Sequence, residues 1–250
     1  MSVDRERIIS ACNKALRPEL FRDYAPNGLQ VEGRDSIGDI LTAVSASQAA
    51  ITKAIASGAD ALLVHHGIFW GKGETRLTGT LRERVAALLS AGVNLLAWHL
   101  PLDAHPTLGN NARLAQLLGI TQHPQEKPTD LVVYGEFASP IDGEKLLERL
   151  HASLGEQACC YGESNRPIKT IGWCTGAGSD FLEEAAGRGV DAFLTGEASE
   201  RHFHLAHELD IHLFTGGHHA TERYGVQALG EFIAEAFGVN HSFFDQPNPL

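Results

Sequence analysis

The chain has 250 residues, of which 43% are hydrophobic, and its 31 acidic and 20 basic residues leave a formal net charge of −11. This length allows one large core or two cores of about 125 residues each. The acidic balance argues against binding to duplex nucleic acid or an anionic membrane surface, because both need clustered lysine and arginine. A single nucleotide could still bind at a local site.

The N-terminal segment and the cysteines indicate a cytoplasmic protein. The segment "MSVDRERIISACNKALRPEL" is charged and amphipathic, without the apolar stretch of a secretory signal. No other stretch approaches the roughly 20 apolar residues of a membrane span. The four cysteines show no CxxC spacing, so we expect free thiols in a reducing compartment.

Amphipathic helices alternate with short apolar strands along the chain. We predict helices over residues 8–16, 47–57, 80–91, 110–118, 143–154, 180–188, 200–209 and 222–237. We predict strands over residues 40–45, 61–64, 93–98, 131–137, 168–175, 192–195, 211–215 and 242–244. The polar segment "TQHPQEKPTD", at 121–130, contains two prolines and is the best linker candidate. The alternation favours α/β layers with helices on both faces of each sheet.

The two halves of the chain resemble each other. "GADALLVHHG", at 58–67, aligns with "GVDAFLTGE", at 189–197, so that Asp60 falls on Asp191. Each copy follows a strand, a turn of small residues and a helix, and precedes a helix and a further strand. Chance resemblance of short strand–helix units is one alternative. The shared order of elements makes an internal duplication the better interpretation.

Histidines and carboxylates follow the predicted strands. His65 and His66 end one strand, and His99 and Asp103 follow the next. In the second copy the alignment places His218 on His99 and Glu222 on Asp103, four residues apart in both pairs. Open α/β sheets place their ligands at the carboxyl ends of strands. The same residues could be ordinary loop residues, but their repetition with a carboxylate favours a metal site.

The donor types restrict the metal. Mixed imidazole and carboxylate ligands suit zinc, manganese, iron or nickel, and a carboxylate can bridge two such ions. No cysteine lies near these histidines in the sequence, which argues against a cysteine-rich structural zinc site.

Several motifs together resemble one family. "DYAPNGLQVEG", "VHHGIFW", "WHLPLDAHPTLGNNARLAQLLG", "DAFLTGE" and "GHHATERYGVQAL" are similar to the GTP cyclohydrolase I type 2 homologue family, also called the Nif-three-like dinuclear metal-centre proteins. The resemblance runs from about residue 24 to residue 249, and the short bacterial members are the most similar because no domain is inserted after the linker.

The resemblance implies two similar, intertwined three-layer α/β/α domains with a dinuclear metal site at their interface. We expect the first domain to comprise 1–127 and 216–250 and the second 128–215. The implied ligands of the two divalent ions are His65, His66, Asp103, His218 and Glu222, with Glu222 bridging. His99 falls beside them as a ligand, a supporting group or a proton-transfer group, and His219 turns away. Many family members form toroidal hexamers, so we expect a homohexamer.

The implied function is metal-dependent hydrolysis of a nucleotide, as in GTP cyclohydrolase, or of a related phosphorylated small molecule. A non-catalytic metal-binding scaffold or regulatory protein that acts through its oligomeric ring is the alternative. Chelator-sensitive turnover would separate the two.

Other residues have simpler interpretations. Asn27 and Gly28 form a turn or line the pocket, and Trp70 and Trp98 adjoin the implied ligands but are more typical of a core. On the predicted helix 200–209 we expect His202, His204 and His207 to be solvated. Cys174 is more typical of a buried strand residue than of a nucleophile. The amides of the glycine-rich "TGAGS" turn, at 175–179, could bind phosphate, although the pattern is neither of the common nucleotide motifs.

Overall fold

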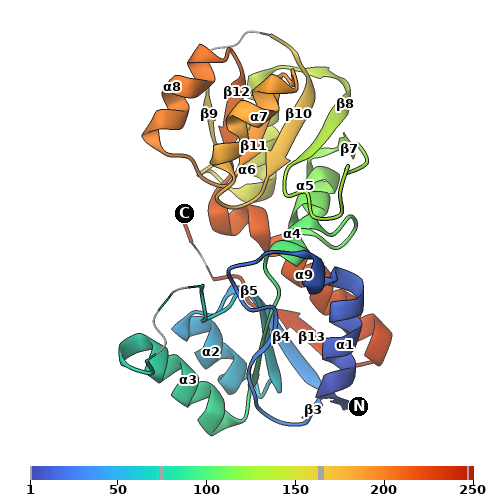
Figure 1. Ribbon diagram of the computed structural model, residues 1–250, viewed down its shortest axis with the longest axis vertical. Helices are drawn as coiled ribbons and strands as arrows, with labels where there is room; N and C mark the ends of the chain where they lie inside the picture. Colours follow the sequence, from blue (N-terminus) through green and yellow to red (C-terminus); the bar gives the residue numbers. More distant parts are fainter. Residues whose placement is uncertain (1, 72, 74–75, 163–165, 247) are drawn as a thin grey trace. The chain divides into compact units, whose positions relative to one another are not determined.

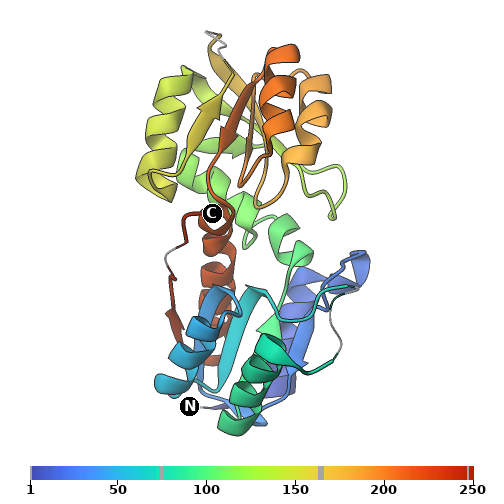
Figure 2. The ribbon, with the colours of Figure 1, turned by 90° about the vertical axis from the view of Figure 1, so that its left-hand side faces the viewer.

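The structure is a computed structural model that describes residues 2–71, 73, 76–162, 166–246 and 248–250. The chain divides into two compact units, each with its own sheet. Unit 1 comprises Met1–Leu102 and Gly225–Pro247, and unit 2 comprises Asp103–Tyr224 and Asn248–Leu250. Figures 1 and 2 show the ribbon from two sides.

The sheet of unit 1 has the strand order β13-β4-β5-β6-β2. Its strands are β2 (Gly28–Val31), β4 (Asp39–Ser45), β5 (Ala61–His66), β6 (Asn94–Ala97) and β13 (Asn240–Phe243). The strands β13, β4, β5 and β6 are parallel, and β2 pairs antiparallel with β6. A separate short ladder joins β1 (Val3–Asp4) to β3 (Ser36–Ile37).

Helices cover both faces of this sheet because its strands are apolar on both sides. Alternate strand residues such as Leu41, Leu62 and Leu95 share a buried core with α2 (Gln48–Ala56) and α3 (Gly79–Ala91). On the other face lie α1 (Arg5–Leu16) and the unit 1 part of α9 (His218–Phe237) (Figure 1). A 3-10 turn, η1 (Pro18–Leu20), follows α1.

The sheet of unit 2 has the order β7-β8-β10-β11-β12-β9. Its strands are β7 (Ile120–Gln122), β8 (Val133–Ile141), β9 (Cys159–Tyr161), β10 (Ile168–Cys174), β11 (Ala192–Thr195) and β12 (His212–Thr215). The strands β10, β11 and β12 are parallel, whereas β8 and β9 flank them antiparallel.

The strand residues of unit 2 also alternate between two cores. Trp173, Leu194 and Phe214 share one core with α5 (Asn110–Leu118) and α6 (Gly143–Leu154). Phe193 and Leu213 share the other with α7 (Leu182–Gly187) and α8 (Glu200–Glu208). A short helix, α4 (Leu100–Ala104), and a 3-10 turn, η2 (Ser179–Phe181), complete the elements. Each unit is thus a three-layer α/β/α fold.

The two units repeat one plan. The parallel triad β4-β5-β6 in unit 1 has the same strand order as β10-β11-β12 in unit 2, and in each an antiparallel strand pairs with the third member. The two aligned aspartates, Asp60 and Asp191, also have the same structural role. Asp60 accepts hydrogen bonds from the amides of Gly38 and Asp39 at the start of β4. Asp191 accepts them from Lys169 and Thr170 at the start of β10. The predicted duplicated α/β fold is confirmed.

The compact units meet after Leu102 and after Tyr224, whereas the boundaries were expected at residues 127 and 215. Leu114 and Leu118 of α5 pack into the same core as Leu146 and Leu150 of α6, which places the segment after Leu102 in unit 2. The polar segment at 121–130 begins inside strand β7, which pairs with β8. In these compact units, helix packing and not local composition decides which unit a segment joins.

The predicted helices and strands are all present, with shifted ends. The strand predicted over 61–64 continues through His66, which pairs with Ser45 of β4. The helix predicted from Glu222 begins four residues earlier, at His218. The amide of Thr221 donates to the carbonyl of Gly217 at 3.0 Å, so helical hydrogen bonding starts directly after the Gly216–Gly217 turn. The short strands β1, β2, β3, β7 and β9 and the helix α4 were not predicted.

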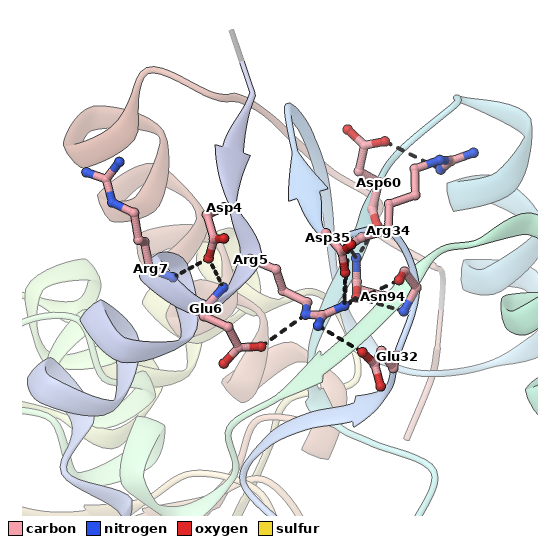
Figure 3. Close-up of polar contacts among 10 residues, drawn as sticks. Asp4, Arg5, Glu6, Arg7, Glu32, Arg34, Asp35, Asp60 and Asn94 are labelled. Atoms are coloured by element: carbon pink, nitrogen blue, oxygen red, sulfur yellow. Dashed lines mark hydrogen bonds and ion pairs between the residues drawn. The ribbon is translucent and has the colours of Figure 1, made fainter.

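Figure 3 shows how Arg5 fastens the start of α1 within unit 1. The Arg5 side chain is buried and donates to the carbonyls of Gly33 and Arg34 at 3.3 and 3.4 Å. It also donates to the side-chain oxygens of Asn94, at 3.4 Å, and Glu32, at 2.9 Å. A buried guanidinium is stable only with such a full set of acceptors. The network therefore ties the first helix to the segment after β2 and to β6.

Within the part of the chain that the structure describes, none of the helices combines the length and the apolar character needed to cross a bilayer.

We expect Asp60→Ala and Asp191→Ala each to lower the free energy of unfolding by about 1–3 kcal/mol, because each change leaves two strand amides without their acceptor. Chemical denaturation of the purified variants measures this. Glu83→Ala is the control, since that carboxylate is exposed on α3 and the change should alter stability by no more than about 0.5 kcal/mol. Equal stability of all three variants would contradict the capping role.

Candidate metal centre

Three histidines meet at the carboxyl ends of β5 and β6 in unit 1. His65 and His66 are the last two residues of β5, and His99 lies two residues beyond β6. The strands are parallel neighbours with Val64 beside Ala97, so both end at the same edge of the sheet. One ligand nitrogen from each histidine lies within 4.8 Å of the other two. These three side chains could hold a metal ion.

Hydrogen bonds at Nδ1 orient two of these rings. His65 Nδ1 donates to the carbonyl oxygen of Trp98 at 3.0 Å, and His99 Nδ1 donates to the carboxylate of Asp23 at 2.9 Å. A carbonyl and a carboxylate only accept, so each neutral ring carries its lone pair on Nε2. Metal-binding histidines are usually oriented through their second nitrogen in this way. Each of the two rings is therefore oriented so that the lone pair of Nε2 is available to a metal ion.

The third ring, His66, receives its support from the neighbouring parallel strand. Its Nδ1 lies 3.1 Å from the hydroxyl oxygen of Ser45, the last residue of β4. The centroid of its ring lies 4.6 Å from that of His65 and 5.7 Å from that of Trp70. Three successive parallel strands thus contribute to one polar edge.

The carboxylate of Asp23 fixes the surroundings of His99. It accepts hydrogen bonds from the amides of Ala25 and Leu100, at 2.9 and 3.0 Å, and from the Asn27 side chain at 3.0 Å. Asn27 in turn accepts the amide of His99 at 2.8 Å. Burial raises the pKa of the Asp23 carboxyl, but these bonds, led by the one from His99, lower it to about 2. Asp23 is therefore ionised at neutral pH.

Sequence reasoning missed Asp23, because 76 residues separate it from His99. The available signal was its place just ahead of the Asn27–Gly28 turn, for which both a turn and a role near the pocket were considered. In the structure the Asn27 side chain accepts the amide of His99, and Gly28, with a φ of +101°, is the first residue of β2.

In unit 2, His218 and Glu222 lie one turn apart at the start of α9. His218 Nε2 lies 3.1 Å from Glu222 Oε2, and His218 Nδ1 lies 3.4 Å from Oε1 of Glu197. Burial lowers the pKa of His218, but the two carboxylates raise it to about 9. The imidazole therefore carries a proton at neutral pH, and a divalent ion bound at the ring would replace that proton.

Asp103 in α4 places a second buried carboxylate near Glu222. An oxygen of each lies within 4.8 Å of the other, and the two residues are 6% and 3% exposed. Asp103 Oδ1 accepts hydrogen bonds from Asn110 Nδ2 at 2.8 Å and from Thr175 Oγ1 at 3.2 Å. Two buried carboxylates repel each other unless a cation lies between them. The donor chemistry of unit 2 therefore fits a divalent metal ion.

The glycine-rich turn after β10 supports these donors. A Cβ at Gly176 would overlap Glu222 Oε1 and lie 3.1 Å from His218 Nε2, so only glycine fits there. The amide of Gly176 donates to Thr221 Oγ1, and that of Gly178 donates to Thr195 Oγ1. These two amides serve the protein itself, which weakens the expectation that the turn binds phosphate.

The cysteine of this region is a core residue, as predicted. Cys174, at the end of β10, is buried, and burial, with smaller contributions from Asp103 and Glu222, raises the pKa of its thiol. A thiol with a raised pKa is a poor nucleophile.

The remaining histidines lie outside the donor groups found among the described residues. The ring of His204 is 63% exposed, as expected for a solvated residue of α8. The expectation was wrong for His202, which is 3% exposed. Its Nδ1 accepts a hydrogen bond from the amide of Ser199 at 3.1 Å and its Nε2 lies 3.3 Å from Asp180, so it caps the start of α8. A cap at the third helical position needs the ring to fold back over the turn.

The comparisons with known proteins agree on one family. The family model described as Duf34/NIF3 (NGG1p interacting factor 3) matches residues 3–249. A protein of Yersinia pestis named GTP cyclohydrolase 1 type 2 homolog is 48% identical over 238 residues, which cover 95% of this chain and 96% of that protein.

Solved structures have the same fold. One described as "Structural genomics, protein ybgI, unknown function" has a TM-score of 0.95 and 44% identity, covering 99% of this chain and 100% of that one. The TTHA1606 structure from Thermus thermophilus has a TM-score of 0.91 and 33% identity, with the same coverage. The resemblance noted in the sequence motifs is confirmed, and the chain belongs to the Duf34/NIF3 family.

Proposed function

We propose that the protein binds two divalent metal ions and is a metal-dependent hydrolase of a nucleotide or a related phosphorylated small molecule. The observation that carries the proposal is the orientation of the donors. His65 presents Nε2 because its Nδ1 is already bonded, and Asp103 and Glu222 are buried carboxylates close together. Donors oriented in this way are typical of metal sites. Their burial costs free energy, which a purely structural role would not explain.

The ligands that we assign are His65, His66, Asp103, His218 and Glu222, with the Glu222 carboxylate shared by both ions. Imidazole and carboxylate donors without a thiolate suit zinc, iron, manganese or nickel. The fit of the residues supports this assignment in each unit separately. His65 and His66 supply the imidazoles of unit 1, and the other three supply the donors of unit 2.

Bound divalent ions would supply Lewis-acid polarisation of the scissile bond and would acidify nearby water. The protein's own part is to orient the donors and to move a proton. We assign the proton transfer to His99 Nε2, because the bond from Nδ1 to Asp23 holds the neutral ring in one tautomer and leaves Nε2 available.

The substrate class follows from charge and from the relatives. A net charge of −11 argues against duplex nucleic acid as substrate, whereas a mononucleotide needs only a local site. The name of the Yersinia pestis relative refers to a GTP cyclohydrolase. We therefore propose a single purine nucleotide, or a small phosphorylated molecule like it, as substrate.

We place the protein in the cytoplasm and propose that it assembles into a homohexamer. All four cysteines are free thiols, which a reducing compartment preserves. A closed ring of identical chains is a common symmetric assembly.

We expect reconstituted wild-type protein to contain about two equivalents of metal per chain by elemental analysis. Glu222→Gln should lose more metal than His65→Ala, His66→Ala or His218→Ala, because the shared carboxylate serves both ions. His204→Ala is the matched control, since its exposed ring lies outside the donor groups. Less than one equivalent in the wild-type protein would contradict the assignment.

We expect His99→Ala to lower kcat by about 100- to 10,000-fold while leaving the metal content unchanged, because the variant loses a proton carrier. Asp23→Asn should lower kcat less, since the imidazole remains but loses its ionised partner. Steady-state hydrolysis of GTP together with metal analysis measures both. Loss of metal in His99→Ala would make His99 a ligand instead. If fully metallated wild-type protein hydrolyses no nucleotide with any of several metals, the scaffold alternative holds.

Light scattering at micromolar concentration should return a mass about six times the 27.0 kDa of one chain. The measurement is repeated after chelation, which shows whether assembly depends on metal. A mass near 27.0 kDa for the metal-loaded protein would rule the hexamer out.

A further inference from the structure

Two aromatic rings of unit 1 stand beside the histidine cluster and have no part in the proposed chemistry. Tyr24 is 59% exposed, although it is a large aromatic residue. The centroid of its ring lies 5.8 Å from that of Trp70 and 5.1 Å from that of His99. Trp70 is half-buried, and its ring centroid lies 5.3 Å from that of His99. We call Tyr24 and Trp70 the aromatic shelf.

Hydrogen bonds from the main chain hold the shelf in place. The amide of Gly71 donates to the carbonyl of Tyr24 at 2.5 Å, and Trp70 Nε1 donates to the carbonyl of Gly67 at 3.1 Å. The side chain of Gln30 accepts the amide of Ile68 at 2.9 Å, which links β2 to the segment after β5. The two rings are therefore presented by backbone that is already ordered, so a ligand would not have to order it.

A second close approach fixes the same two segments. A Cβ at Gly67 would overlap the end of the Gln30 side chain, which would have to move to admit any other residue. The amide nitrogen of the Gln30 side chain donates to the carbonyl of Pro26 at 2.8 Å, which ties β2 to the segment that follows Tyr24. Local structure thus accounts for the position of the shelf but not for the exposure of the Tyr24 ring.

The geometry of the shelf restricts what can bind. A flat ring inserted between two others needs about 7 Å between their centres, twice the contact distance of carbon atoms. The rings of Tyr24 and Trp70 are 5.8 Å apart and tilted by 36°, so a ligand ring cannot enter between them. It can stack only on the outer face of Tyr24. Flat heteroaromatic rings stack on tyrosine with little dependence on their identity.

We propose that the aromatic shelf binds the heteroaromatic base of a nucleoside phosphate, with Tyr24 as the stacking residue and Trp70 as its support. For the binding of the phosphate the proposal rests on the proposed function, because only a metal-loaded donor cluster would attract that group. It adds a residue that selects the substrate by its ring. A sugar phosphate without a base would lose this contact.

Calorimetric titration of metal-reconstituted protein tests the shelf without any turnover. The probes are guanosine 5′-monophosphate and ribose 5-phosphate, which share the phosphate and the ribose and differ in the base. We expect the nucleotide to bind wild-type protein at least about fivefold more tightly, the lower end of the energy of one base stacked on an aromatic ring. Tyr24→Leu should abolish this difference and leave the affinity for ribose 5-phosphate unchanged.

Two variants serve as controls. Tyr24→Phe keeps the ring and should keep the difference between the probes, and the exposure of Tyr24 makes misfolding of Tyr24→Leu unexpected. Quenching of tryptophan fluorescence by the nucleotide should disappear in Trp70→Phe, because Trp98 and Trp173 are fully buried. Equal affinity of the two probes for wild-type protein, no binding of either probe, or an undiminished difference in Tyr24→Leu would overturn the proposal.

The outcomes also separate the shelf from the proposed function. If the difference in affinity between the two probes depends on Tyr24 but no nucleotide is hydrolysed, the aromatic shelf is supported and the proposed hydrolase activity is contradicted. If the protein hydrolyses a nucleotide and Tyr24→Leu leaves the KM unchanged, the hydrolase activity is supported and the aromatic shelf is contradicted.

Discussion

Parallel strand pairing is the constraint on which the arrangement of donors depends. In unit 1, β4, β5 and β6 run side by side in the same direction, so Ser45, His66 and His99 arrive at one edge although they are far apart in sequence. In unit 2, the parallel strands β10, β11 and β12 likewise end where the glycine turn and the start of α9 meet. Antiparallel pairing would send successive strand ends to opposite edges.

Three of the buried side chains at the candidate site, His65, His99 and Asp103, have polar partners that lower the cost of their burial. The Trp98 carbonyl serves His65, the Asp23 carboxylate serves His99, and Asn110 with Thr175 serves Asp103. Burial of a polar group without such a partner costs about 1–3 kcal/mol. The partners also remove rotational freedom from each donor. The contacts that stabilise these side chains therefore also fix their orientation.

The two copies of the repeat have kept their structural residue and diverged in their donors. Asp60 and Asp191 both cap the strand that precedes them in their sheet. The position of His65 in the first copy corresponds to Gly196 in the second, where a Cβ would lie 2.6 Å from the carbonyl of Gly176. The position of His66 corresponds to Glu197, which contacts His218 instead. One copy thus supplies imidazoles where the other supplies a tight turn and a carboxylate.

The sequence by itself determined the layered α/β plan, because strands that are apolar on both faces and helices that are apolar on one face can pack in few ways. It also pointed to His65, His66, His218 and Glu222, since strand ends and helical spacing are properties of the local chain. The partners Asp23 and Glu197, the burial of His202 and the position of Tyr24 beside His99 were decided only by the tertiary structure. The reason is physical: a hydrogen bond between residues 76 positions apart leaves no periodic trace in the sequence. Such a contact forms only when the segments that carry the two residues have packed together.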